Sequence, residues 1–429
     1  MRKPWLILLV LTVVLSVVPL LGVDFPSLKV GVAKADITPE DPIQMAGYAA
    51  RKGLSTGVHD PLSARAIVFE LDGTRLAFVT TDLLGFYART AEPLREAILA
   101  KTGLRPAELF LSAIHTHAGP ALTLDAETGH PNNVRYTQQL RQKLPELVES
   151  ALASLQPASI TVGEGTSPIG ANRRELRISP EGESSIVLGR NAYGPTDKQV
   201  LVVRVLKTDG RALATLFDYA THATSLGPQN YLISGDVLGL AEQVVERISD
   251  SGGFAAAFAG ASGNIDPWYR VLPRFNTEPG WTPEPVLLGS LLGQEVVHAY
   301  RATIEPQKVD RIRAAIKVLQ LPAKGGSDST TLPVQTLPFV ITAARIGDVG
   351  FIGLGGEVLT EIGLAIKAGS PFRHTFVITH CNGAAGYLVP RHLFVEGGYE
   401  VQSTRFAPSA ADIVVRESIR LLHSLDPDE

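Results

Sequence analysis

Apolar and polar residues follow two rhythms along the chain, which predict strands and helices in turn. The apolar runs Ala64–Glu70 and Arg75–Thr80 are joined across Asp72-Gly73, a dipeptide that favours the tight turn of a β-hairpin. Residues Arg89–Lys101 have the period of an amphipathic helix and are followed by Gly103, a residue suited to a helix C-terminus. We therefore expect the folded part to start with a hairpin and a helix.

The same two patterns continue to the end of the sequence. Helical periodicity is found at Val134–Leu155, Val237–Ile248, Ser290–Thr303, Leu359–Ala368 and Ala411–His423. Strand-like runs are found at Leu109–Ile114, Gln199–Leu206, Ala212–Tyr219, Arg311–Leu321, Phe339–Arg345, Gly350–Leu354 and Thr375–Thr379. Strands interleaved with helices are typical of α/β proteins, and hairpins add antiparallel pairs. We predict a single α/β catalytic domain over residues 24–429, with mixed β-sheet layers and flanking helices.

Two segments show neither pattern and are predicted to be long loops. Trp268–Pro285 is rich in proline and aromatic residues, and Ala323–Pro338 is rich in Gly, Ser, Thr and Pro. Loops of this length in a compact domain are usually functional or mobile. The first follows directly on a candidate site segment, so it is either a lid or rim of the site or a plain surface excursion.

The N-terminus has the pattern of an export signal. Met-Arg-Lys-Pro precedes the apolar stretch Trp5–Val23. The stretch is long for the core of a signal peptide and lacks a clear cleavage site before Asp24, so residues 1–23 are a signal peptide or a retained membrane anchor. Either one predicts that residues 24–429 lie outside the cytoplasm, secreted or anchored to the membrane.

Composition narrows the chemistry. A net charge of −4 without a run of Lys or Arg argues against a nucleic-acid partner, and 45% hydrophobic residues argue against disorder. The single cysteine, Cys381, excludes a zinc site built on several thiolates, and burial as a small apolar residue is its expected role. A transition metal bound here therefore needs histidine and carboxylate ligands.

Two histidines stand at the end of a predicted strand. In Ser112-Ala113-Ile114-His115-Thr116-His117, the histidines are two residues apart. On a strand such residues share a face with Cα atoms roughly 7 Å apart, so both imidazoles can reach one ion at about 2.1 Å. A His-x-His pair also occurs for packing reasons, so this motif alone does not decide between the two.

Two further segments place metal-ligand residue types at strand ends. His222 follows the predicted strand Ala212–Tyr219, and open α/β sheets gather their sites at the carboxyl ends of strands. Glu357, in Gly355-Gly356-Glu357, lies between a predicted strand and a predicted helix. A structural histidine and a helix-start acid are the alternatives. His130, His380 and His392 are additional histidines near these segments.

Several segments resemble, in their residues and their order, segments in the catalytic domain of neutral ceramidases. These are zinc amidases that split ceramide into sphingosine and a fatty acid. The resemblance runs from about Gly31 to Pro408. The matching segments are Val32–Pro39, Met45–Tyr48, His59–Ala66, His115-Thr116-His117, Ile233–Asp236 and Gly356-Glu357.

The resemblance implies functional residues at matching positions. The implied zinc ligands are His115, His117, His222, Glu357 and Tyr387. Tyr387 and Tyr399 keep the family spacing of two tyrosines, although an earlier family tyrosine is Ala384 here. Tyr399 matches a hydroxyl suited to stabilising an oxyanion, and Arg173 matches a substrate-facing arginine, for which a solvated surface role is the alternative.

Two departures bear on the activity. The family has a serine beside the zinc where this chain has Asp266, which suggests a carboxylate acting as general base on water at the metal. Larger family members continue into a C-terminal β-sandwich that helps to close the substrate site, whereas this sequence stops at Glu429.

The sequence is compatible with three functions. The first is a zinc-dependent hydrolase that cleaves the amide bond of a small-molecule or lipid N-acyl substrate with metal-activated water. The second is a zinc-binding homologue without turnover, and the third is a metal-dependent esterase or lactonase acting on a small molecule. The N-terminal apolar segment adds a possible association with a membrane.

Overall fold

The hairpin predicted around Asp72-Gly73 lies inside the largest sheet. The computed structural model describes residues 28–249, 253–267, 284–303, 305–325 and 335–426. Strand β3 (Ser63–Leu71) pairs antiparallel with β4 (Thr74–Thr81), and Asp72 and Gly73 have positive φ values of 50° and 77°, as a tight hairpin turn requires. The expectation that the fold starts here is wrong, because β1 (Lys29–Asp36) precedes the hairpin and pairs antiparallel with β3.

The largest sheet has eight strands. Their order is β12 (Phe254–Ala259), β10 (Ala212–Tyr219), β9 (Gln199–Lys207), β6 (Gln156–Thr166), β1, β3, β4 and β5 (Leu109–Ala113). The pairs β4–β5 and β10–β12 are parallel and the others are antiparallel, so the prediction of a mixed sheet is confirmed.

A four-stranded sheet lies against it. Its order is β14 (Ile312–Pro322), β15 (Thr336–Ile346), β16 (Val349–Leu354) and β18 (His374–Ile378), with β16 and β18 parallel. Strand β15 starts at Thr336, so the loop predicted at Ala323–Pro338 ends earlier than expected. Residues 326–334 of this loop lie outside the described part. Most of the predicted loop Trp268–Pro285 also lies outside it, and helix α4 takes its last residues.

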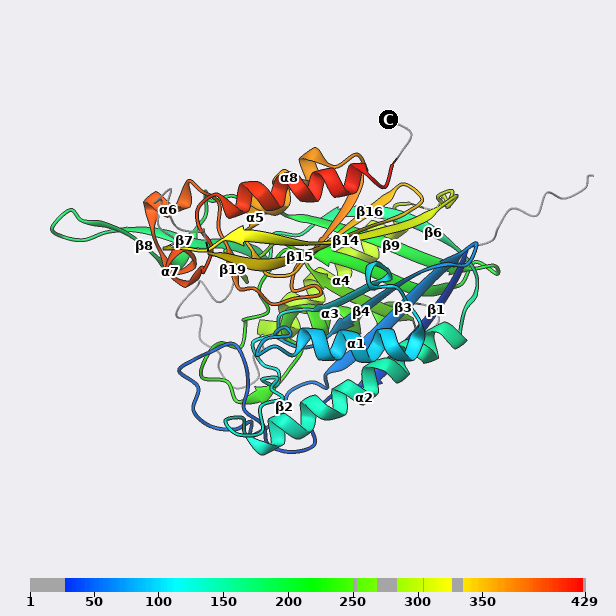
Figure 1. The fold of residues 1–429 in the computed structure, drawn as a ribbon, viewed down its shortest axis with the longest axis horizontal. Helices are drawn as coiled ribbons and strands as arrows, with labels where there is room; N and C mark the ends of the chain where they lie inside the picture. Colours follow the sequence, from blue (N-terminus) through cyan, green and yellow to red (C-terminus); the bar gives the residue numbers. More distant parts are fainter. Residues whose placement is uncertain (1–27, 250–252, 268–283, 304, 326–334, 427–429) are drawn as a thin grey trace, which may run out of the picture.

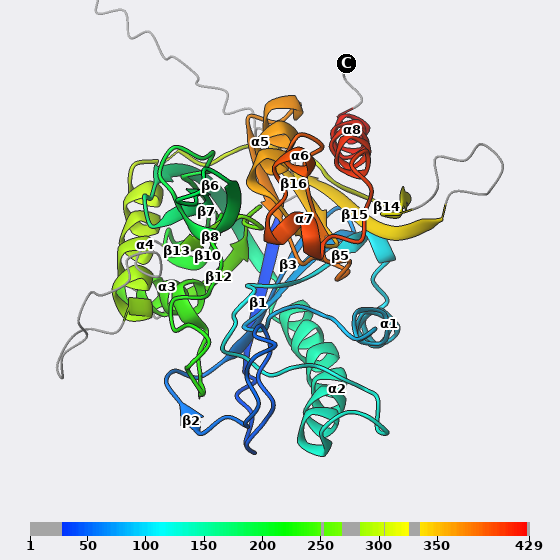
Figure 2. The same ribbon diagram turned by 90° about the vertical axis from the view of Figure 1, so that its left-hand side faces the viewer.

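Helices cover the outer faces of both sheets (Figures 1 and 2). Those on the large sheet are α1 (Ala91–Thr102), α2 (Pro131–Ala153), α3 (Asp236–Ile248) and α4 (Glu284–Arg301); those on the small sheet are α5 (Thr360–Gly369) and α8 (Ala410–His423). All six follow predicted helices to within a few residues, except that α4 starts at Glu284 instead of Ser290. Gly103 ends α1 with a φ of 69°, as predicted.

Aromatic side chains fill the space between the two sheets. The ring centroid of Phe78 in β4 lies 4.9 Å from that of Phe110, 5.8 Å from that of Phe258 and 4.8 Å from that of Phe351 in the small sheet. Cys381 is free and buried in this same cluster, in the apolar role that was predicted for it. The two sheets therefore share one core, and the chain has four layers in the order helix, sheet, sheet, helix.

Besides β1, β6 and β12 of the large sheet, several smaller elements have no counterpart in the prediction. The strands β7 (Gly170–Ile178), β8 (Ser184–Asn191) and β13 (Ile265–Pro267) form a three-stranded sheet, from which β7 and β8 project as a hairpin in Figure 1. The others are β2 (Gly57–Val58), β11 (Leu232–Ile233), β17 (Glu357–Val358), β19 (Tyr387–Leu388) and the short helices η1 (Pro106–Glu108), α6 (Leu393–Glu396) and α7 (Tyr399–Ser403).

The carboxyl ends of strands from both sheets meet at one place. The segments after β5 and β10 pair with each other, because the backbone N–H of His117 donates to the carbonyl oxygen of Ala223 at 3.0 Å. Between the sheets, Oδ2 of Asp218 in β10 accepts from the backbone N–H of Val377 in β18 at 3.0 Å. Chain segments far apart in the sequence are thereby held side by side at the site.

The structure says little about the membrane. Among the residues that it describes, no helix has the length and apolar character needed to cross a bilayer. The predicted signal peptide or anchor at residues 1–23 lies outside the described residues.

Candidate metal centre

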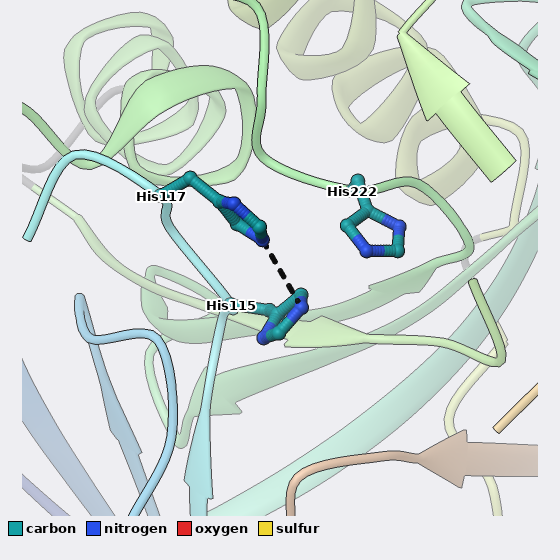
Figure 3. Close-up of side chains that lie close together, drawn as sticks. All are labelled: His115, His117 and His222. Atoms are coloured by element: carbon teal, nitrogen blue, oxygen red, sulfur yellow. Dashed lines mark hydrogen bonds between the residues drawn. The ribbon is translucent and has the colours of Figure 1, made fainter. Parts of the chain in front are cut away.

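Two of the candidate histidines follow strand β5. The strand ends at Ala113, and His115 has a left-handed backbone conformation with a φ of 62°. The prediction that His115 and His117 share a face of the strand is therefore wrong, because the strand has ended and the chain turns at His115. Their Nε2 atoms nevertheless lie 3.3 Å apart, and Figure 3 shows His222 from the segment after β10 beside them.

Backbone carbonyl groups orient two of the imidazoles. Nδ1 of His115 lies 2.6 Å from the carbonyl oxygen of Leu84, and Nδ1 of His222 lies 2.8 Å from that of Ser262. A carbonyl oxygen only accepts, so each neutral ring carries its hydrogen on Nδ1 and presents a lone pair on Nε2. This is the form in which an imidazole binds a metal, with the other nitrogen held by a partner.

Glu357 reaches the group from the small-sheet side. It lies in β17, between β16 and α5, and is 6% exposed. Its Oε1 is 2.9 Å from Nε2 of His222 and 3.5 Å from Nε2 of His115. Burial opposes the negative charge, but the two histidines hold the pKa of Glu357 well below its ordinary value. The side chain therefore contributes a carboxylate.

The arrangement fits a bound cation. Lone pairs of two imidazoles face a carboxylate oxygen at 2.9 and 3.5 Å, which is repulsive unless a proton or a metal ion lies between them. Ligand atoms of His115, His117 and His222 all lie within 4.8 Å of one another. A tetrahedral ion with bonds of about 2.1 Å separates its ligand atoms by about 3.4 Å. Burial lowers the pKa of His117 and of His222, which favours neutral imidazoles ready to bind a metal.

Arg173 of β7 contacts the same group. Its NH2 donates to the hydroxyl of Tyr387 at 3.0 Å, and its NH1 donates to Oδ1 of Asp266 at 3.2 Å and lies 3.4 Å from Nε2 of His222. The ring of Tyr399 lies 5.7 Å from the ring of Tyr387 and 5.7 Å from the guanidinium of Arg173. Burial works against the charge of Arg173, but the surrounding acidic groups, first Asp266, hold its pKa well above the ordinary value.

The structure thus gathers every residue predicted for the site. The alternative of a solvated surface arginine at position 173 is wrong, because this side chain is 6% exposed and bonded on all sides. Burial and then the charge of Glu357 raise the pKa of the Tyr387 hydroxyl. His130 and His392 do not belong to the group: His130 caps the start of α2, and His392 precedes α6.

Three further residues, for which the sequence predicted no role, lie at the site. His380 stacks on His115 with ring centroids 3.8 Å apart and planes at 10°. Tyr87 lies close enough for Glu357 and Tyr399 to add to the effect of burial in raising its pKa. At Gly47, with a φ of 96°, a Cβ would lie 2.5 Å from the ring of His117. Gly47 gave a signal as part of the Met45–Tyr48 match, and His380 as a histidine near a candidate segment, whereas the position of Tyr87 arises from the fold alone.

Comparison with known proteins adds a family to this geometry. Residues 28–269 match the family described as "Neutral/alkaline non-lysosomal ceramidase, N-terminal". The chain is 30% identical to neutral ceramidase 2 of Arabidopsis thaliana over 238 residues, which are 52% of this chain and 30% of that protein. It is 30% identical to the neutral ceramidase of Pseudomonas aeruginosa over 264 residues, which are 59% of this chain and 38% of that protein. The aligned parts thus cover less than half of each relative.

A solved structure shows the same fold. The crystal structure of neutral ceramidase from Pseudomonas aeruginosa superposes with a TM-score of 0.75 at 20% identity, covering 94% of this chain and 75% of that one. A coverage of 94% of the chain extends well beyond residues 28–269, which the family match covers.

Proposed function

Because the chain belongs to the neutral/alkaline non-lysosomal ceramidase family, we propose that it is a zinc-dependent hydrolase that cleaves the amide bond of an N-acyl lipid or small molecule. The observation that carries the proposal is the convergence of His115, His117, His222 and Glu357 as acceptors facing one another inside the protein. Histidine and carboxylate ligands without thiolates suit zinc, and one further ligand is assigned to Tyr387.

The chain's own residues have separable tasks in this reaction. When bound, the zinc ion would polarise the scissile carbonyl and lower the pKa of water, as zinc does in other hydrolases. We assign the stabilisation of negative charge on the carbonyl oxygen to Arg173, whose NH1 and NH2 face the site, and to the hydroxyl of Tyr399, whose ring lies beside that guanidinium. Asp266 is assigned the general base, and Thr224 orients it through a hydrogen bond of 3.4 Å to Oδ1.

Burial supports these tasks. His222 is 0% exposed, and Glu357 and Asp266 are each 6% exposed. Charges interact more strongly where water is excluded, so the carboxylates and Arg173 exert a larger effect on the substrate than they would at the surface. The partially exposed ring of Tyr399, at 44%, marks the side from which a substrate can enter.

We also propose an exported location for the enzyme. The apolar segment Trp5–Val23 behind two positive residues supports secretion or attachment to a membrane. An enzyme held at a membrane surface would meet N-acyl lipids where they reside. This location is tested by fractionating cells that express the full-length chain and probing the mature N-terminus.

A second function is favoured by one position. Asp266 stands where the family resemblance places a serine, so a homologue that binds zinc without turnover is the alternative. An esterase or lactonase differs from the amidase and from the zinc-binding homologue in that it hydrolyses an ester bond. These possibilities differ in what purified protein does with matched amide and ester substrates.

The decisive experiment measures zinc content and turnover together. Full-length protein is compared with His115→Ala and, as a control, with His298→Ala, whose side chain is 74% exposed on α4. We expect near one zinc per chain and hydrolysis of a short fluorescent N-acyl amide, both lost in His115→Ala and kept in His298→Ala. Zinc without amide or ester hydrolysis would support the binding homologue, ester hydrolysis alone would support the esterase, and protein without zinc would overturn the proposal.

A further inference from the structure

Glu400 is a buried carboxylate that the proposed chemistry does not use. It lies in α7, is 0% exposed, and sits between two arginines that are neighbours on β7. Its Oε1 accepts from Nε of Arg173 at 2.8 Å, and its Oε2 accepts from NH1 of Arg174 at 2.8 Å. Hydrogen bonds between ionised groups in the interior are strong, and a partner left alone there is costly.

Arg173 presents one edge to Glu400 and another to the metal centre. Nε is held by Glu400, while NH2 donates to the hydroxyl of Tyr387 at 3.0 Å and NH1 donates to Asp266 at 3.2 Å. A guanidinium is planar, so a bond at Nε fixes the directions of its other donors. The direction in which NH1 and NH2 face the site therefore depends on Glu400.

The strand that carries both arginines is irregular at this point. Consecutive residues of a regular strand point to opposite faces, yet Arg173 and Arg174 reach the same carboxylate. The β7–β8 ladder shifts register between Asn172 and Arg174, and the backbone N–H of Arg173 donates to the carbonyl oxygen of Asn264. Such breaks in a ladder redirect side chains beside functional sites.

The second arginine ties the carboxylate to the segment before α7. NH2 of Arg174 donates to the carbonyl oxygen of Gly397 at 2.9 Å. Gly398, with a φ of 91°, allows the backbone to approach, because a Cβ there would lie 2.9 Å from Ile186 and 3.1 Å from NH1 of Arg174. The start of α7 is thereby held against β7 and β8.

Helix α7 contains Tyr399 and contacts Tyr387. Tyr399 is its first residue, and its ring lies 5.7 Å from that of Tyr387. At the other end, Oγ1 of Thr404 donates to the carbonyl oxygen of Tyr387 at 2.7 Å. A shift of α7 would therefore move Tyr399 and loosen Tyr387 together.

We propose that Glu400 is a positioning residue: it fixes the donor edge of Arg173 toward the metal centre and, through α7, the places of Tyr387 and Tyr399. The inference rests on the proposed function for its activity readout and on the fold for its second readout. It assigns Glu400 no contact with substrate.

The kinetic test compares Glu400→Gln, which keeps the shape and removes the charge, with Glu396→Gln. The control residue bonds the same Arg174, but its side chain is 47% exposed. We expect Glu400→Gln to lower kcat about 10- to 100-fold, the usual cost of losing a residue that orients a metal site, with KM little changed. Glu396→Gln is expected to match the wild type. Equal kcat in Glu400→Gln and the wild type would overturn the inference.

A double-mutant cycle separates positioning from general destabilisation. If Glu400 acts through Arg173, the loss in kcat caused by Glu400→Gln becomes smaller when it is added to Arg173→Gln, which leaves only the part transmitted by α7. Losses that multiply would overturn the route through Arg173. Should Glu400→Gln fail to fold, Glu400→Asp keeps the charge but withdraws the carboxylate by one methylene, and the same loss and the same cycle are expected.

A measurement without turnover keeps this inference apart from the proposed function. The Nε–Hε NMR signal of Arg173 is assigned by its absence in Arg173→Lys. We expect the signal to shift and to exchange faster with water in Glu400→Gln but not in Glu396→Gln. A wild type that cleaves no N-acyl substrate would refute the proposed function alone, whereas an unchanged Arg173 signal in Glu400→Gln would refute the positioning role.

Discussion

Asp218 should make the stability of this protein depend on pH in a narrow window. The side chain is 2% exposed in β10, and its Oδ2 accepts from the backbone N–H of Val377 in the other sheet at 3.0 Å. Burial, opposed by the charge of Lys367, raises the pKa of Asp218 from 3.8 to about 6. The folded protein therefore keeps this proton at pH values where the unfolded chain has lost it.

The sign and size follow from that difference. The stabilisation from the bound proton is fully present below pH 3.8 and is lost as the pH rises through about 6. Each pKa unit corresponds to about 1.4 kcal/mol, so the difference amounts to about 3 kcal/mol in the free energy of unfolding. In Asp218→Asn the side-chain amide oxygen still accepts from the backbone N–H of Val377, but the side chain no longer titrates.

Urea unfolding at pH values from 4 to 7.5 tests this expectation. Relative to the wild type, Asp218→Asn is expected to gain about 2.5 kcal/mol of unfolding free energy between pH 4 and 7, with most of the gain below about pH 6.5. Asp209→Asn, a change at an exposed turn, serves as the control and should show no such gain. A constant difference between Asp218→Asn and the wild type across this range would refute the reasoning.

The remaining predictions concern the metal centre. Gly47→Ala should lower zinc content and turnover, since its Cβ would lie 2.5 Å from the ring of His117, whereas Gly73→Ala, with a similar positive φ and nothing within 4 Å, should keep both; equal zinc in the two variants would contradict this. Asp266→Asn should keep the metal and lose about 100-fold or more in kcat, as expected of a general base, and unchanged turnover would exclude that role. Chelation should lower the Tm of the wild type, and added zinc should restore it; a Tm that ignores the chelator would argue against a bound ion.

Much of the fold could be predicted because its core elements have strong local patterns. The hairpin at Asp72-Gly73 combines a turn dipeptide with strands buried on both faces, and α1 combines helical periodicity with Gly103 at its end. The candidate histidines could be found because they follow apolar strands, and such strand ends meet in α/β folds. These signals depend on a few adjacent residues.

The parts that could not be predicted depend on distant partners. Strand β7 contains Arg173, Arg174 and Glu175 in succession, which resembles a solvated loop until Glu400 and Asp266 are brought to it. Strand β12 is Phe-Ala-Ala-Ala-Phe-Ala, a composition equally compatible with a helix, and only its pairing with β10 makes it a strand. The positions of Tyr87 and His380 likewise follow from sheet packing.

If the chain binds the proposed zinc ion, the shared core has a consequence for how the protein responds to its metal supply. His222 and Glu357 are 135 residues apart in sequence; His222 follows β10 of the large sheet, and Glu357 follows β16 of the small one. An ion held by both would cross-link the chain and close a long loop. The stabilisation expected from such a link grows with the length of the loop that it closes. Loading with zinc and docking of the two sheets are then one linked equilibrium. Scarcity of the metal would lower the amount of intact protein as well as its activity.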